Sequence, residues 1–114
     1  MAHPPVVELP ASLVGRSLTV AGLAAWVFVH SSREDEATRC GEIQDVLNAA
    51  LAHGEHDVLV ARPVVERAID LWERAADILD ESPAGQADHR AATERAQQIE
   101  RLRVRASGLR RLLE

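Results

Sequence analysis

Hydrophobic residues recur at spacings of three and four along most of this chain, which is the period of an α-helix with one buried face. The clearest stretch places Val65, Ile69, Trp72 and Leu79 on one side and mainly acidic residues on the other. The last stretch is the longest, since about 30 helical residues would span roughly 45 Å. The pattern predicts four helices, at about residues 11–30, 33–53, 63–81 and 83–113.

Two segments lack this helical repeat. We expect residues 1–10 to form an extended N-terminal arm and residues 57–61 a short extended linker. A chain of 114 residues is long enough for one hydrophobic core. The prediction is therefore an all-α fold, a four-helix bundle-like single domain over residues 1–114 with a long C-terminal helix.

Residues that favour helix ends stand between the predicted helices. Ser31 and Ser32 precede acidic residues at the spacing of a capping box, which predicts the start of the second helix. Gly54 is expected to end that helix in the left-handed conformation. Pro63 and Pro83 suit the first turns of the third and fourth helices, because a proline there gives up only an unpaired N–H group.

The first predicted helix is apolar on every side from Val20 to Val29. A short strand at residues 26–29 is the alternative, but helix is favoured because no later segment offers a convincing strand partner. The uninterrupted apolar run is ten residues long, whereas a membrane span needs about 20. The N-terminus does not resemble a signal peptide, and one cysteine cannot form an internal disulfide. We therefore expect a cytoplasmic protein with no membrane segment.

The residues that should meet in the core are the larger apolar side chains on the inner face of each helix. Cys40 is expected to be a small buried residue among them rather than a nucleophile. The predicted core includes Leu18, Trp26, Phe28, Ile43, Leu47, Ile69, Trp72, Leu79 and Ile99.

Composition adds an uneven charge distribution. Residues 1–81 carry 6 arginines and 14 acids, and residues 82–114 carry 7 arginines and 4 acids, with no lysine anywhere. The basic cluster could follow phosphates, so a nucleic-acid-associated protein using the Arg-rich C-terminal helix is the alternative function. No aromatic residue in that segment could stack on bases, and the net charge is −5. Nucleic acid is therefore the less favoured partner. The cluster consists of Arg101, Arg103, Arg105, Arg110 and Arg111.

His53 and His56 raise the question of a metal site. They stand three residues apart across the predicted end of the second helix, with Glu55 and Asp57 beside them. A histidine in the last helical turn is also favoured by the free carbonyls and the helix dipole there. Cys40 lies too far along the helix, roughly 20 Å, to complete a site. We expect a turn without bound metal, and metal-dependent activity at His53 and His56 is the second alternative.

The sequence contains no phosphate-binding glycine loop, no nucleophile elbow and no zinc motif, so we expect no enzyme activity and no cofactor. The first hypothesis is a non-catalytic helical protein–protein interaction module, either a homodimer or a small accessory subunit of a bacterial multi-protein system. The apolar first helix and the long fourth helix, expected to extend past the third, offer surface for a partner. The predicted contacts are Leu23, Trp26, Leu102, Leu109 and Leu113, with Arg105 and Arg110 at the rim.

Overall fold

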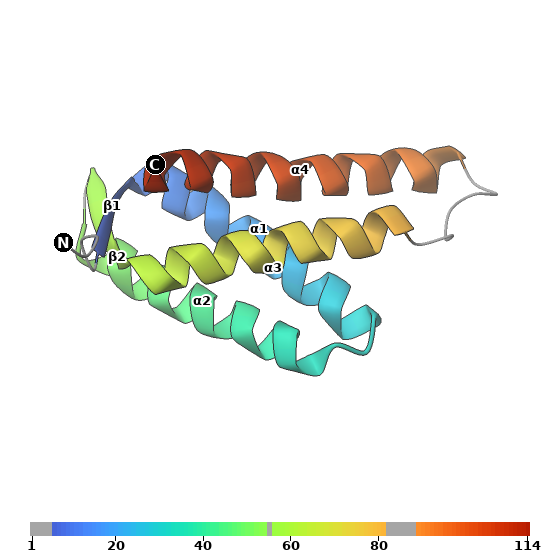
Figure 1. The fold of residues 1–114 in the computed structure, drawn as a ribbon, viewed down its shortest axis with the longest axis horizontal. Coiled ribbons are helices and arrows are strands. Elements are labelled where there is room, and N and C mark those ends of the chain that lie inside the picture. Colours follow the sequence, from blue (N-terminus) through green and yellow to red (C-terminus); the bar gives the residue numbers. More distant parts are fainter. Residues whose placement is uncertain (1–5, 55, 82–88) are drawn as a thin grey trace.

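Four helices and two short strands make up the part of the chain that the structure, a computed structural model, describes: residues 6–54, 56–81 and 89–114 (Figure 1). The helices lie close to their predicted ranges, and the first is helical through residues 26–29, so the strand alternative there is wrong. The predicted start of the fourth helix, at Pro83, lies outside the described residues. The elements in order are β1 Val6–Pro10, α1 Ala11–His30, α2 Glu34–Ala52, β2 Asp57–Ala61, α3 Arg62–Glu81 and α4 His89–Leu113.

The helices pair as two hairpins. α1 packs along α2, and α3 packs along α4, each pair being consecutive in the chain. α1 also contacts α3 and α4, whereas the described parts of α2 and α4 do not touch. The helix α1 therefore lies at the centre, and the molecule is elongated, with extents of 50 × 29 × 25 Å.

The N-terminal arm and the linker before α3 are paired in a two-stranded antiparallel sheet at one end of the molecule (Figure 1). Val7 lies opposite Val60 and Leu9 opposite Val58, and these four side chains are buried while their neighbours along each strand are exposed. The fold is mostly helical, and the two segments that were expected to be extended pair with each other, which the prediction of an all-α fold did not include. Each strand is too short to be stable alone, so the pairing depends on a contact between segments about 50 residues apart.

The core is built around α1, seven of whose side chains are buried. Phe28, Ile43, Leu47, Ile69 and Trp72 are buried as predicted. Leu18, Leu79 and Ile99 are partly buried and pack against the core. By length and composition alone α1 could also cross a membrane, so the expectation of no membrane segment stays a prediction.

Trp26 is a correction to the predicted core, because its side chain is 49% exposed. The neighbouring Val27 and Phe28 point inward and are almost completely buried. A helix that is apolar on every side gives no pattern from which to choose its inner face. The choice is made by the positions of α2 and α3, which leave Trp26 on the open side.

The connection from α1 to α2 uses Ser32 in a way that the capping pattern did not predict. Ser32 has a φ of 59°, and the N–H of Arg33 donates to the carbonyl of Phe28 at 2.8 Å. The N–H of Ser32 donates to Val29 at 3.3 Å. These two bonds form a Schellman motif, which closes α1. The serines therefore end α1, and α2 begins at Glu34 without a side-chain cap.

Gly54 ends α2 for a steric reason. It does not have the positive φ expected of a left-handed cap; instead, a Cβ atom built there would stand 2.2 Å from the Cγ1 atom of Val58. Only glycine lets β2 turn back this closely on the end of α2.

The helix α4 continues through Ser107 and Gly108 to Leu113 without a break. Its carboxyl end lies beside the start of α3, since Arg62 Nη2 donates to the carbonyl of Leu113 at 3.2 Å. The prediction that α4 extends past α3 through Leu109 and Leu113 is therefore wrong. The 25 residues of α4 outrun the 20 of α3 at the opposite end, around His89 (Figure 1).

Trp72→Ala is expected to lower the free energy of unfolding by about 3 to 5 kcal/mol, because the side chain is completely buried and its removal leaves a cavity. The half-exposed Trp26 supplies the control: Trp26→Ala is expected to cost about 1 kcal/mol or less. Urea denaturation followed by far-ultraviolet circular dichroism measures both. Equal losses in the two variants would contradict the position of Trp72 in the core.

Ser32→Gly is expected to raise the free energy of unfolding by about 0.5 to 1 kcal/mol, because glycine adopts a positive φ without steric cost. Ser31→Gly is the matched control, since Ser31 has a φ of −106° and gains nothing from the added freedom. Thermal and urea denaturation of the pair should move in opposite directions. A Ser32→Gly protein less stable than the parent would rule out the Schellman geometry.

Candidate functional site

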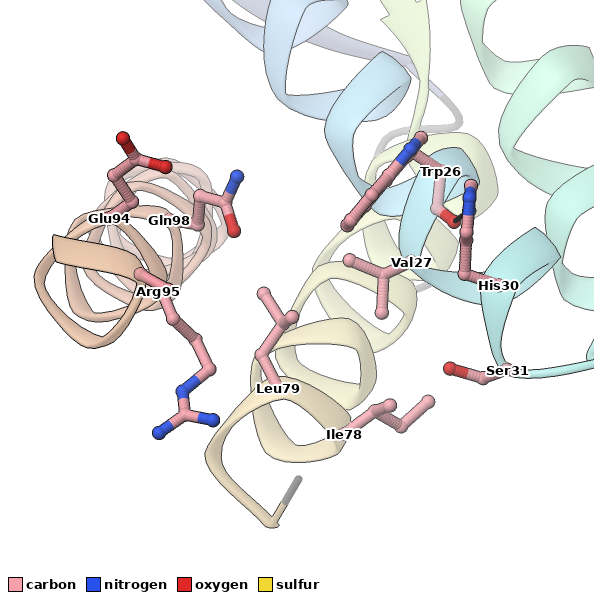
Figure 2. A pocket seen from close by; sticks show the side chains of 10 residues that line it. Trp26, Val27, His30, Ser31, Ile78, Leu79, Glu94, Arg95 and Gln98 are labelled. Atoms are coloured by element: carbon pink, nitrogen blue, oxygen red, sulfur yellow. Dashed lines mark hydrogen bonds between the residues drawn. The ribbon is translucent and has the colours of Figure 1, made fainter. Parts of the chain in front are cut away.

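A groove opens between α1 and α4 where the two helices diverge. At the carboxyl end of α1, a cavity of about 360 Å³ is bounded by α1, α3 and α4. Figure 2 shows Trp26 on one wall, Leu79 and Ile78 on the floor, and the polar side chains of α4 on the far wall. We call this part the Trp26 end of the groove. It is lined by Trp26, Val27, His30, Ser31, Ile78, Leu79, Ala91, Glu94, Arg95 and Gln98.

Trp26 is held in its exposed position by His30. The two ring centroids are 4.3 Å apart with an interplanar angle of 35°. The Nδ1 atom of His30 lies 2.9 Å from the carbonyl oxygen of Trp26, and because a carbonyl can only accept, Nδ1 carries the proton. The contact orients the indole beside the cavity. The hydrogen bond uses Nδ1 of His30 and does not involve Nε2. Val29, 58% exposed, extends the apolar surface on the same helix.

A second cavity, of about 660 Å³, lies between the same two helices nearer the start of α1. Three arginines line it, together with the exposed Val104 and one acid, Glu100. We call this part the arginine end of the groove. Its lining residues are Arg16, Thr19, Val20, Gln97, Glu100, Arg101, Val104 and Arg105.

The two ends belong to one side of the molecule. On α1, Arg16, Thr19 and Trp26 are separated by three and seven residues, which places them on one helical face. On α4, Gln98, Arg101 and Arg105 follow the same repeat. The two cavities therefore lie along the same face of α1 and the same face of α4, and the lining is apolar at the Trp26 end and basic at the arginine end.

The arginines of α4 divide into two groups. Arg103 donates to Asp77 and Asp80, each at 3.3 Å, and these hydrogen bonds raise the pKa of its guanidinium. Arg110 pairs with Glu73. These pairs join α4 to the acidic outer face of α3. The Arg-rich segment is thus not one continuous basic surface.

Arg16, Arg101 and Arg105 form the other group and face the groove. Within the described parts of the chain, none of the three has a carboxylate partner. Arg105 is partly buried, and its Nε atom is buried without a hydrogen-bond partner. Sequence reasoning singled out Arg105 but read Arg16 only as an interruption of an apolar run. The sequence did contain a signal that Arg16 could be functional, because it is the one Arg or acid within residues 11–30.

The predicted interface residues separate into accessible and buried ones. Leu23 is partly exposed, and Trp26 and Arg105 line the groove. Leu102 and Leu109 are 0% and 2% exposed, so a second folded chain cannot reach them, and we remove them from the interface. The sequence pattern placed both residues on an apolar stripe of α4, and in the structure α3 and α1 cover this stripe. The other two lie elsewhere: Leu113 packs partly buried against the core, and Arg110 is occupied by Glu73.

His53 and His56 lie at the turn between α2 and β2, with both side chains exposed. The carbonyl of His56 accepts a hydrogen bond of 2.7 Å from the N–H of Ala11, which joins this turn to the start of α1. Among the described residues no group of three or more His, Cys, Asp or Glu side chains could hold a metal ion. Glu55 lies outside the described residues, so the absence of metal here stays a prediction.

Cys40 is completely buried on the inner face of α2. Burial, and to a smaller extent the charge of Glu36, raises the pKa of its thiol from 9.0 to about 11. The thiol is therefore protonated near neutral pH, and a protonated thiol is a poor nucleophile and metal ligand. This agrees with the expectation of a structural residue.

Comparisons of the chain with protein-family models, with curated proteins and with solved structures each found no match. Function is therefore inferred from the residues of the groove and the chemistry they can perform.

Cys40 should react with a thiol reagent at pH 8 only as fast as the protein unfolds, because the native thiol is buried and protonated. The same protein in urea should react at once.

The raised pKa of Cys40 also means that the unfolded state loses its proton first, so the free energy of unfolding should fall as the pH rises from 9.0 to about 11. Cys40→Ala should lack this component of the pH dependence. Rapid labelling of the native protein would contradict burial of the thiol.

Proposed function

We propose that this protein is a non-catalytic protein–protein interaction module whose α1–α4 groove binds a segment of a partner. The observation that carries the proposal is the half-exposed Trp26 at the mouth of an apolar-floored cavity. A tryptophan offers a large apolar surface and one hydrogen-bond donor, and such residues dominate the binding energy of many interfaces. Leaving it exposed without a partner gives up the free energy of burying that surface.

The groove supports protein binding better than catalysis. Its walls belong to helices, and its Trp26 end has an apolar floor beside the polar side chains of α4, a mixture that is also found in the interfaces of protein complexes. Ser31 and His30 both line the Trp26 end, but among the described residues no hydrogen bond joins their side chains, and Nδ1 of His30 bonds to the carbonyl of Trp26. Glu94 is the one described acid in that lining. The partner's segment would supply the apolar side chains that cover Ile78 and Leu79.

A partner of another sequence is favoured over a second copy. The case for a homodimer depended on the apolar first helix and on apolar residues of α4, and of the latter Leu102 and Leu109 are already buried within the chain. An accessory subunit of a multi-protein assembly in the cytoplasm is the form of the proposal that we prefer. In it, the two helical hairpins act as a bundle-like scaffold that presents the groove.

Trp26→Ser is expected to weaken the complex with the natural partner by about 30-fold in Kd, the effect of losing one interface hot spot of about 2 kcal/mol. The partner is first isolated by co-purification with the tagged wild-type protein from its native cell, then produced separately for titration calorimetry. Leu59→Ser is the matched control, because Leu59 is 63% exposed on β2, at the sheet end of the molecule.

The proposal predicts a Leu59→Ser protein that binds like wild type. Equal affinities of wild type, Trp26→Ser and Leu59→Ser would contradict a partner site at the Trp26 end. Light scattering of the purified protein at micromolar concentration tests the homodimer directly. If the wild-type protein is a dimer and the Trp26→Ser protein is a monomer, the partner is a second copy of this chain and not another protein.

A further inference from the structure

The arginine end of the groove carries positive charge that the described chain does not balance. The chain as a whole is acidic, with a net charge of −5, and acids on α3 neutralise Arg103 and Arg110. Among the described residues, Glu100 is the one acid that lines the arginine end, against Arg16, Arg101 and Arg105. Three cations around one cavity repel one another, and an anionic group between them relieves that repulsion.

Arg105 gives a second, independent indication of a missing partner. The Nε atom of its guanidinium is buried and makes no hydrogen bond among the described residues. Buried donors without a partner are uncommon, because each costs about 1 to 3 kcal/mol relative to a satisfied one. The Nε atom itself is covered by the protein, so a carboxylate that enters the cavity would pair with the terminal nitrogens of the Arg105 guanidinium.

We infer that the arginine end binds the carboxylates of an acidic, partly apolar segment of a partner protein, whose apolar side chains contact the exposed Val104. This inference rests on the proposed function and specifies the chemistry of the partner. Arg101 and Arg105 are four residues apart and adjacent on α4. Acids at the same spacing on a partner helix would meet both, and Arg16 would bind a third carboxylate from the opposite wall.

Protein is favoured over nucleic acid by the groove's own residues. Val104 is 55% exposed between the arginines and offers nothing to a phosphate backbone, whereas an apolar side chain of a peptide would cover it. Glu100 repels a carboxylate as well as a phosphate, but a peptide can place a basic or neutral residue opposite it, whereas a phosphate backbone is negative throughout. The described lining of the arginine end contains no aromatic ring on which a base could stack.

The test is a selection of random peptides displayed on phage against the full-length protein. Selected peptides are expected to be enriched in Asp and Glu beside Leu, Ile or Val. Peptides selected against the double variant Arg16→Gln with Arg105→Gln should not be enriched in Asp and Glu. Arg74→Gln with Arg111→Gln is the charge-matched control, because both arginines are exposed and lie outside the groove's lining, and it should select the same peptides as wild type.

The best synthetic peptide is then titrated by fluorescence anisotropy. Its Kd should rise by about 10-fold or more for Arg16→Gln with Arg105→Gln and for the peptide with Gln in place of Glu, consistent with the loss of charge-assisted hydrogen bonds. The Kd should also rise with salt, because charges at a partly open groove are screened. Unchanged affinity after either replacement would overturn the inference.

The outcomes separate this inference from the proposed function. Peptides that depend on Trp26 but show no acidic preference would overturn the acidic partner and leave the interaction module standing. No peptide enrichment at all would count against both. A single-stranded or duplex DNA oligonucleotide that binds more tightly than any selected peptide, and loses affinity in Arg16→Gln with Arg105→Gln, would replace the acidic segment by nucleic acid.

Discussion

The burial of α1 is the constraint on which the rest of this structure depends. Its small side chains Ala21 and Ala24 have no exposed surface, which lets the neighbouring helices approach its backbone closely. Even Ser17 is buried there, with its hydroxyl donating to the carbonyl of Leu13 at 2.7 Å. Since α1 is apolar on every side from Val20 to Val29, the fold is stable only when several elements surround this part of the helix. The two hairpins and the sheet supply that cover.

The cover is incomplete at one place, and this creates the groove. α4 lies against α1 near the start of α1 and diverges from it toward Trp26 (Figure 1). Side chains of α3 fill the floor, but no described element covers the outer face of Trp26. The groove is therefore a consequence of packing α1 against an α4 that lies mainly along α3.

The ion pairs between α3 and α4 contribute little to stability. Arg103, Arg110 and their partners are largely solvent-exposed, where a pair contributes at most about 1 kcal/mol. The rotation of α4 about its axis is set mainly by the burial of Leu102, Ala106 and Leu109, and these ion pairs agree with that orientation. With Arg103 and Arg110 turned toward the acids of α3, the helical repeat turns Arg101 and Arg105 toward α1. Uneven charge along the sequence thus becomes one neutralised face and one basic face.

The sequence by itself determined the helices, their approximate ends and most of the core, because a helical repeat of apolar residues such as Val65, Ile69 and Trp72 is a local property. It did not determine the sheet, because the pairing of Val7 with Val60 is a long-range contact between two segments that are only extended when taken alone. Nor could it assign Trp26 to the surface or Leu109 to the core. Both lie on helices with more apolar surface than one neighbour can cover, and only the positions of the other helices decide which part stays exposed. The groove was beyond sequence reasoning for the same reason: Arg16 and Arg105 become neighbours only through the packing of α1 against α4.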